Sequence, residues 1–363
     1  MDSVFAYTNH SGTERSLVLV NNSYTSQSGW IKTSTLFNTD PTSGKPNLVS
    51  EELIVALSFD VENSYYVIFQ EQSSGLWYIR KVEEIRNQGL FMELSGYQSQ
   101  IYLGFQLVND TDAIPWWNIH QDLNGRGIND FAPLFRRIEL EPVHRLFCNL
   151  MKFISSEEVL PDSKSLFMKF APLLEAMLEM ENISPLLKDV EEFAQNYEAL
   201  LTQSQKLLAA RPSKSLEQHR FVLACTYFAR QVHAAIPESP KSMVDIYELE
   251  EQINQCLDTA QAVNLAGLLS VLEFADRARE LLKRDTHGFF TDLFKRRSVP
   301  EYFQINEVEG IEWFNQERMD NFIKYLSALY PQELSAPESS RIMRSVKVSN
   351  FKLKAFLAHL SKS

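Results

Sequence analysis

The chain has 363 residues and is acidic, with 47 Asp and Glu residues against 35 Lys and Arg residues and a formal net charge of −12. This negative balance disfavours nucleic acid and an anionic membrane surface as partners, because both require a clustered positive field. The hydrophobic content of 44% is sufficient for large cores, and the length predicts two or three domains.

No apolar run reaches roughly 18 residues, the length of a membrane-spanning helix, so we expect no membrane partner. The N-terminus shows no signal peptide. The cysteines Cys148, Cys225 and Cys256 are odd in number and far apart in the sequence. We expect each to be a small buried hydrophobic residue in a protein of the reducing cytoplasm.

Residues 1–110 predict an antiparallel β-sandwich, because turn-forming residues such as Asn9–Gly12 and Ser73–Gly75 separate short apolar runs. A short helix over Leu48–Leu57 and a turn of helix over Val82–Gln88 are expected between the strands. The predicted strands are Val4–Tyr7, Arg15–Val20, Trp30–Thr33, Tyr65–Phe69, Leu76–Ile79, Leu90–Leu94 and Gln100–Val108. Short strands at this spacing are typical of a sandwich.

Residues 111–363 predict a mainly α-helical domain, because apolar residues recur at helical spacing beyond the polar break Asn109–Asp112. We expect about eight helices without a fixed-period repeat. Ser155–Glu158 predicts a capping box, and Asn315 predicts the N-cap of a helix that ends before Pro331. The expected helices cover Glu139–Phe153, Ser165–Met180, Ser184–Leu208, Ser215–Ala235, Ser242–Leu257, Leu265–Leu282, Thr286–Phe294, Asn315–Leu329 and Pro337–Leu360. The fold class predicted is therefore α+β with two domains.

Several short motifs resemble those of one protein family. They are Phe5–Tyr7, Glu14–Leu19, Asn21–Tyr24, Gly29–Ile31, Gly89–Leu94, Tyr97–Gln98, Leu123–Gly127 and Gly310–Arg318. These motifs are similar to the β-sandwich after the catalytic barrel, and to later segments, in large bacterial proteins of the alpha-amylase family. The resemblance implies α-glucan metabolism, with the chain as a C-terminal region that packs on a catalytic barrel.

Catalysis in that family depends on carboxylates at the C-terminal ends of barrel strands. This sequence lacks the alternating strands and helices of a barrel, so no catalytic residue is carried over. The seven histidines show no paired metal spacing, and no nucleophile elbow occurs. Leu123–Gly127 lacks the lysine of a phosphate loop and predicts a tight turn. We therefore expect no catalytic residue, no metal and no cofactor.

Aromatic residues offer one functional possibility, because sugar rings stack on exposed aromatic planes while polar groups bind the hydroxyls. Trp116, Trp117 and His120, just after the β region, are the candidate carbohydrate-binding residues. For the two tryptophans, packing in a core or between the domains is the favoured interpretation, and carbohydrate binding is the functional alternative. Trp30 and Trp77 are expected in the core of the sandwich.

Three functions remain open. The first is a non-catalytic accessory region of an alpha-amylase-like glycoside hydrolase, which predicts a bare apolar patch on the β domain where the barrel docks. The second is a freestanding helical interaction or scaffold protein without enzymatic activity, which predicts a groove or dimer face on the helices and a polar outer surface on the β domain. The third is an independent enzyme with a cleft at Trp116–Arg126, lined by convergent polar groups.

Overall fold

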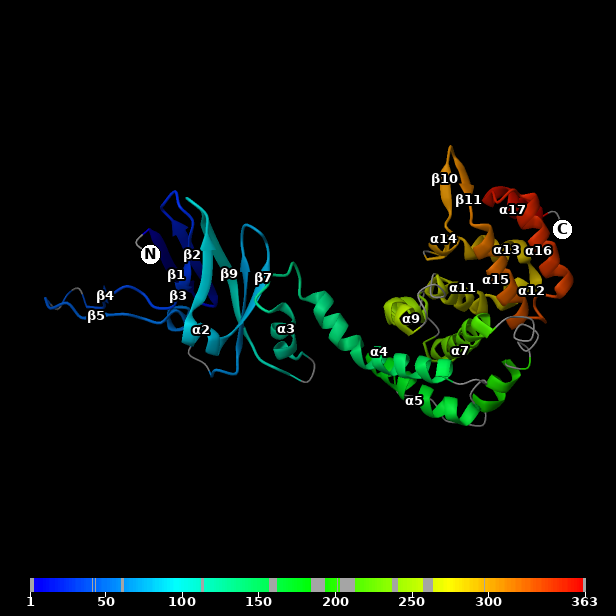
Figure 1. Cartoon of the computed structure of the whole chain (residues 1–363), viewed down its shortest axis with the longest axis horizontal. Coiled ribbons are helices and arrows are strands. Elements are labelled where there is room, and N and C mark those ends of the chain that lie inside the picture. The colour runs from blue at the N-terminus through cyan, green and yellow to red at the C-terminus, as the bar shows by residue number, and fades with distance from the viewer. Residues whose placement is uncertain are drawn as a thin grey trace. The chain divides into compact units, whose positions relative to one another are not determined.

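The computed structural model describes residues 3–40, 42, 44–59, 62–111, 114–156, 162–183, 193–200, 202, 213–236, 241–256, 264–296 and 298–361. The chain divides into two compact units, the sheet unit (Met1–Glu139) and the helical unit (Leu140–Ser363) (Figure 1). An antiparallel sheet at the N-terminus followed by helices confirms the predicted fold class. The sheet unit extends beyond residue 110, the predicted boundary, because the helix α3 (Trp116–Leu123) packs against the sheet.

Five antiparallel strands form the main sheet of the sheet unit, in the order β1-β2-β9-β6-β7. The strands are β1 (Val4–Ser11), β2 (Glu14–Asn21), β6 (Tyr66–Glu71), β7 (Trp77–Lys81) and β9 (Ser99–Val108). β1 and β2 form the hairpin expected around Gly12, and β6 and β7 form the one expected around Gly75. Each of these two glycines has a positive φ, which suits a tight turn.

The inner face of this sheet is covered by a two-stranded ribbon and two short helices, instead of a second large sheet. The ribbon pairs β3 (Gln27–Ile31) with β8 (Leu90–Leu94), and the helices are α1 (Leu53–Ala56) and α2 (Val82–Gln88). Apolar side chains from all these elements share one core with β2, β6 and β9. The helix expected over Leu48–Leu57 is only α1, because its first residues form β5 (Leu48–Val49) opposite β4 (Phe37–Asn38).

The outer face of the sheet is covered over only half of its width. At β6 and β7, side chains of α3 and Phe131 pack on Tyr66, Ile68 and Ile79. Ile128 extends this cover, because its backbone exchanges two hydrogen bonds with Trp77, at 2.7 and 2.9 Å. At β1, β2 and β9 the same face carries apolar side chains at the surface. This open half consists of Phe5, Tyr7, Val18, Val20, Ile101 and Leu103.

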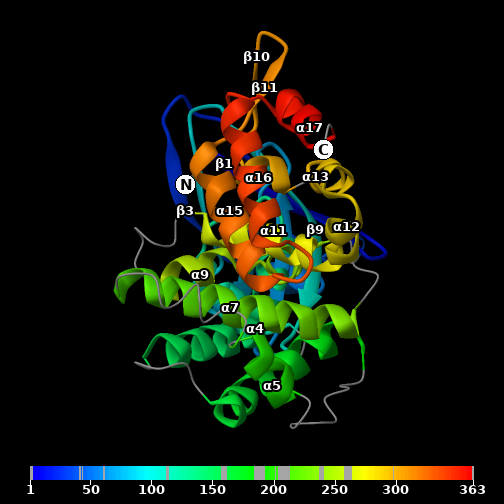
Figure 2. The ribbon, with the colours of Figure 1, turned by 90° about the vertical axis from the view of Figure 1, so that its right-hand side faces the viewer.

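The helical unit is built around α11 (Leu265–Arg277), which is buried on nearly all sides. A helix that is apolar around its circumference occupies the centre of a domain. α11 contacts α7, α8, α9, α12, α13, α14 and α15. In Figure 2, α15 and α16 run side by side, and α15 also contacts α11.

The remaining elements follow in sequence order, and the first of them begins before the unit boundary at Glu139. They are α4 (Ala132–Ser156), α5 (Ser163–Met180), α7 (Ser213–Ala235), α8 (Met243–Ile246), α9 (Glu250–Cys256), α12 (Arg279–Arg284), α13 (Thr286–Leu293), α14 (Val299–Tyr302), β10 (Asn306–Val308), β11 (Ile311–Trp313), α15 (Gln316–Leu329), α16 (Ala336–Val348) and α17 (Leu353–Ser361). Asn315 caps α15 as predicted, because its side chain accepts a hydrogen bond from the backbone N–H of Arg318 at 3.1 Å.

The described residues contain more helices than the roughly eight expected, because three predicted helices each form two and because α3 and α14 were not predicted. Ser242–Leu257 breaks at Glu248, which has a φ of 50°, and Pro337–Leu360 breaks at Asn350 and Phe351, with φ of 48° and 63°. Leu265–Leu282 is interrupted at Ala278. A left-handed residue other than glycine carries no strong sequence signal, so apolar periodicity alone passed over the first two breaks.

Some predictions fall on other parts of the chain. Glu158 of the expected capping box and the beginning of the helix expected from Ser184 lie outside the described residues, whereas residues 193–200 are helical. Among the described helices, none combines the length and the hydrophobicity that crossing a bilayer requires.

The cysteines are all free thiols, and only Cys225 is fully buried. Cys148 and Cys256, far apart in the sequence, are neighbours in the fold. Burial, together with the Cys148 thiol beside it, raises the pKa of Cys256 to about 12. The Cys256 thiol therefore stays protonated at neutral pH and reacts slowly.

Candidate functional site

The two adjacent tryptophans lie on α3, and the helix directs them to different surroundings. Trp116 is only 7% exposed, and its ring meets those of Phe131 and Phe135 edge-on at 5.6 and 5.3 Å. Trp117 is 48% exposed, and its backbone N–H donates to Asp110 at 2.8 Å. Trp116 is therefore a core residue in this structure, and Trp117 is the member of the pair that can meet a ligand.

Trp117 and His120 line one cavity of about 410 Å³ between α2 and α3. Successive turns of a helix place residues three apart on one face, which explains why these two side chains point the same way. The wall opposite them carries mostly polar side chains from β7 and α2. The other lining residues are Tyr66, Lys81, Glu83, Glu84, Asn87, Gln88 and Gln121.

Hydrogen bonds fix the position of His120 in this cavity. Its Nε2 atom lies 3.1 Å from Oε2 of Glu84, and its ring lies 5.6 Å from the ring of Tyr66. Glu84 also accepts a hydrogen bond from the backbone N–H of Lys81 at 3.3 Å, at the beginning of α2. This carboxylate therefore joins the first turn of α2 to α3.

The charges around the cavity are mixed. Lys81 forms an ion pair with Glu83 at 2.7 Å, and this hydrogen bond raises the pKa of the Lys81 ammonium. Burial raises the pKa of the Tyr66 phenol, with a smaller contribution from the negative charge of Asp110. Both side chains therefore keep their protons at neutral pH, and each can donate a hydrogen bond.

This arrangement can bind a sugar ring by chemistry that its residues supply directly. The half-exposed indole of Trp117 offers an apolar face, and amides and carboxylates surround it for hydroxyl groups. Among the described residues, no group of three or more His, Cys, Asp or Glu side chains could hold a metal ion. The turn after α3 follows the prediction for Leu123–Gly127: Asn124 has a φ of 43°, and Arg126 donates to backbone carbonyls of Leu123 and Asp122.

The sequence did not predict the exposed aromatic surface that Trp30 and Phe91 form on the sheet unit. The prediction that Trp30 lies in the core is wrong, because its side chain is 52% exposed and meets Phe91 edge-on at 5.4 Å. Trp77 is half-buried and packs against the core formed with α3. The alternation of side chains along a strand predicts two faces, but it does not say which face the rest of the chain covers.

The open half of the main sheet is the other uncovered apolar surface. Phe5 is 57% exposed and Tyr7 is 56% exposed, and both lie on β1 opposite valines of β2. Leu103 of β9 extends the same surface. The alternating aromatic residues of β1 are the signal in the sequence that could have located this surface.

Comparisons with known proteins add no relative to this picture: no family model matches the chain, and neither the curated proteins nor the solved structures contain a match.

Proposed function

We propose that the chain is a non-catalytic accessory region of an alpha-amylase-like glycoside hydrolase, working in the cytoplasm. It packs on the catalytic barrel and contacts α-glucan. The short motifs in the sequence suggest the type of partner, and the open half of the main sheet is the observation that carries the proposal.

The open half has the composition of a docking surface. Two exposed aromatic side chains, Phe5 and Tyr7, lie beside aliphatic side chains of β2 and β9 on one continuous sheet face. Contiguous apolar surface of this kind is uncommon on monomeric proteins, and aromatic residues are enriched at the centres of interfaces. The other half of this face shows how such side chains are buried when α3 covers them.

The alternative, a freestanding helical scaffold protein, predicts a polar outer face on the β domain. The exposed aromatic residues of β1 disfavour that alternative. The cavity between α2 and α3 supports the glucan part of the proposal, because Trp117 and the amides around it suit stacking and hydroxyl recognition.

Docking on the barrel can be tested with an isolated alpha-amylase-family barrel and the double variant Phe5→Ser/Tyr7→Ser. We expect the unmodified chain to form a complex in sedimentation velocity, and the variant to bind about 30-fold or more weakly, as for loss of central aromatic anchors. Phe37→Ser on β4, an exposed aromatic residue outside the open half, is the matched control. Equal binding by all three proteins would contradict the docking surface.

Glucan contact can be tested by titration with maltooligosaccharides while tryptophan fluorescence is recorded. We expect a saturable change that disappears in Trp117→Phe and persists in Trp30→Phe. No response up to millimolar sugar would remove the glucan part of the proposal and leave the docking surface untouched.

A further inference from the structure

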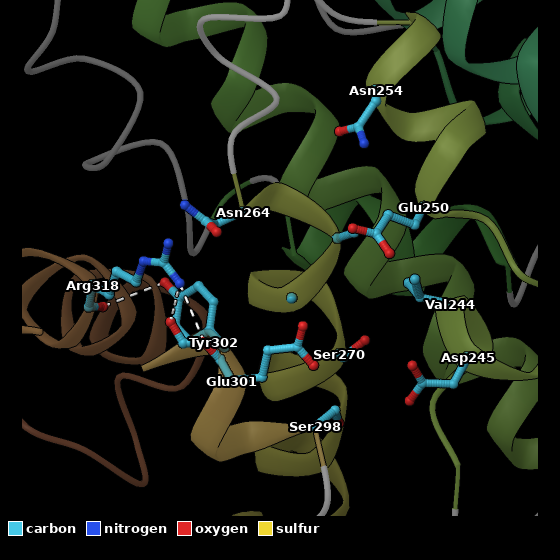
Figure 3. A pocket seen from close by; sticks show the side chains of 12 residues that line it. Val244, Asp245, Glu250, Asn254, Asn264, Ser270, Ser298, Glu301, Tyr302 and Arg318 are labelled. Carbon is cyan, nitrogen blue, oxygen red and sulfur yellow. Dashed lines mark hydrogen bonds between the residues drawn. The ribbon is translucent and has the colours of Figure 1, made fainter. Parts of the chain in front are cut away.

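The helical unit contains its own cavity, of about 410 Å³, between α8, α9, α11, α14 and α15. In Figure 3, Asp245 and Glu250 lie on one side of it, and Asn264, Tyr302 and Arg318 lie on the other. The elements that form it are separated by up to about 70 positions in the sequence, so no local motif marks it. It shares no residue with the cavity beside Trp117.

The cavity continues into a second one of about 590 Å³ on the other side of Tyr302. Asn264, Tyr302 and Arg318 line both cavities. The second cavity adds the amide side chains of Gln218, Gln304, Asn315 and Asn321, and also the charged side chains of Glu317, Asp320 and Lys324. Together the cavities form an amide-lined groove, and each lies within the size range of small-molecule sites.

One wall of the first cavity presents hydrogen-bond acceptors. Asp245 and Glu250 contribute two carboxylates to it, and Glu301 adds a third from the side of Tyr302 (Figure 3). None of the three forms an ion pair with a cationic side chain in the part of the chain that the structure describes. Asp245 is held in place by the fully buried Ser242, which donates to its Oδ2 atom at 2.7 Å. Ser242 in turn lies 2.9 Å from the hydroxyl of Ser270 at the base of the cavity.

The opposite wall presents donors. Arg318 uses Nη1 for the backbone carbonyls of Tyr302 and Glu301, at 2.6 and 3.3 Å, which holds the guanidinium at the edge of the cavity. Asn264 is the N-cap of α11 but makes no side-chain capping hydrogen bond. The side chain of Asn264 therefore leaves the first N–H groups of α11, around Ala266, without the acceptor that an N-cap residue usually supplies.

The shape of the cavity depends on a close approach between two helices. A Cβ atom on Gly267 of α11 would lie 3.1 Å from the ring of Tyr302. Glycine at this position lets α14 approach α11, and Glu301 of α14 then lines the cavity with Ser270 of α11.

The distribution of donors and acceptors selects the ligand. Three carboxylates disfavour an anion, and a simple cation would leave the guanidinium and amide donors without partners. A molecule with many hydroxyl groups donates to the carboxylates and accepts from Arg318 and the amides. We propose that this amide-lined groove binds a neutral oligosaccharide. The inference does not depend on the proposed function, because it concerns a different unit and different residues.

The test uses the full chain and three probes: maltotriose and cellotriose, which are neutral, and trigalacturonate, which is anionic. Calorimetry should show binding of at least one neutral trisaccharide and weaker binding of trigalacturonate. Hydrogen–deuterium exchange should show protection at the start of α11 and in α14. Absence of neutral binding at millimolar concentration, or preferred binding of trigalacturonate, would overturn the inference.

A matched pair of variants separates this site from the one beside Trp117. Glu301→Ala removes a carboxylate from the cavity and should weaken binding about tenfold, whereas Glu280→Ala, also in the first turn of a short helix, should bind unchanged. Protection confined to α2 and α3, or equal binding by both variants, would assign the sugar to the other site and refute this one. The Trp117→Phe variant should keep the protection of α11, whatever the outcome of the fluorescence titration.

Discussion

The two units differ in how far their aromatic side chains are exposed to solvent. Among the described residues, every exposed large aromatic side chain belongs to the sheet unit, whereas the exposed large apolar residues of the helical unit are Met168, Val308, Ile311 and Val348. The helical unit buries its apolar side chains in one core around α11, whereas the sheet unit leaves part of one sheet face uncovered. Self-contained packing and surface recognition are thus separated along the chain.

Substitutions of aromatic residues in the helical unit should therefore affect stability, whereas those on the open half of the main sheet should affect association. A buried aromatic residue contributes its transfer free energy and prevents a cavity, whereas an exposed one contributes little to folding.

The largest effect is expected for Phe290→Ala in the helical unit. Phe290 is fully buried, and its ring meets those of Phe289 and Phe356 edge-on, each at 5.2 Å. We expect a loss of about 4 kcal/mol in the free energy of unfolding, measured by urea denaturation. Tyr24→Ala, at a side chain that is 81% exposed, should change it by less than about 0.5 kcal/mol. Similar losses at both sites would contradict the contrast.

The buried carboxylate of Glu273 should make the helical unit sensitive to pH. Burial outweighs the lowering effect of Arg277 and raises the pKa of Glu273 from 4.5 to about 7. The folded state therefore binds the proton more tightly than the unfolded state. The contribution of Glu273 to stability should be greatest below about pH 4.5 and should fall by up to about 3 kcal/mol as the pH rises to about 7.

The Glu273→Gln variant should remove this dependence, because glutamine does not titrate. The measurement is the urea midpoint across this pH range for the variant, the unmodified chain and Glu280→Gln, at an exposed carboxylate of α12. A slope that persists in Glu273→Gln would show that another group causes it.

The double variant Phe5→Ser/Tyr7→Ser should change the free energy of unfolding by less than about 1 kcal/mol, because both side chains are more than half exposed. Its effect should instead appear in association. We expect weaker self-association at high protein concentration and less binding of a hydrophobic dye. A strong loss of stability would mean that these rings belong to the core of the sheet unit.

A local effect is expected for the contact between His120 and Glu84, whose atoms lie 3.1 Å apart. A double-mutant cycle with His120→Ala and Glu84→Gln should give a coupling of about 1 kcal/mol. A coupling near zero would show that the hydrogen bond does not hold α3 against α2 in solution.

The strands and the change to helices could be predicted from the sequence because both leave a periodic apolar pattern. β6 and α2 appear where expected, since β-branched and aromatic residues and the glycine at position 89 mark them. Gly89 has a φ of 89°, and a Cβ atom there would collide with the backbone of Ile31. Such a position admits only glycine without strain, so the end of α2 was encoded locally.

The sites could be predicted less well, because they depend on contacts between distant segments. The sequence placed Trp116, Trp117 and His120 together, but only the helix of α3 separates the buried indole from the exposed one. Nothing in the sequence joins Asp245 to Arg318, which face the same cavity from α8 and α15. The exposure of Trp30 was also hidden, since it depends on which face of the ribbon the core occupies.

β1 lies at the end of the strand order, with β2 on one side and no strand paired to its other side among the described residues. An edge of this kind can accept a strand from another molecule, and the exposed rings of β1 make that contact more favourable. When the sheet unit is produced without a partner, we therefore expect it to polymerise through β1 and to be lost from solution as aggregate. Natural sheets prevent such growth with a lysine or a proline on the edge strand. Either residue introduced on β1 should therefore reduce polymerisation.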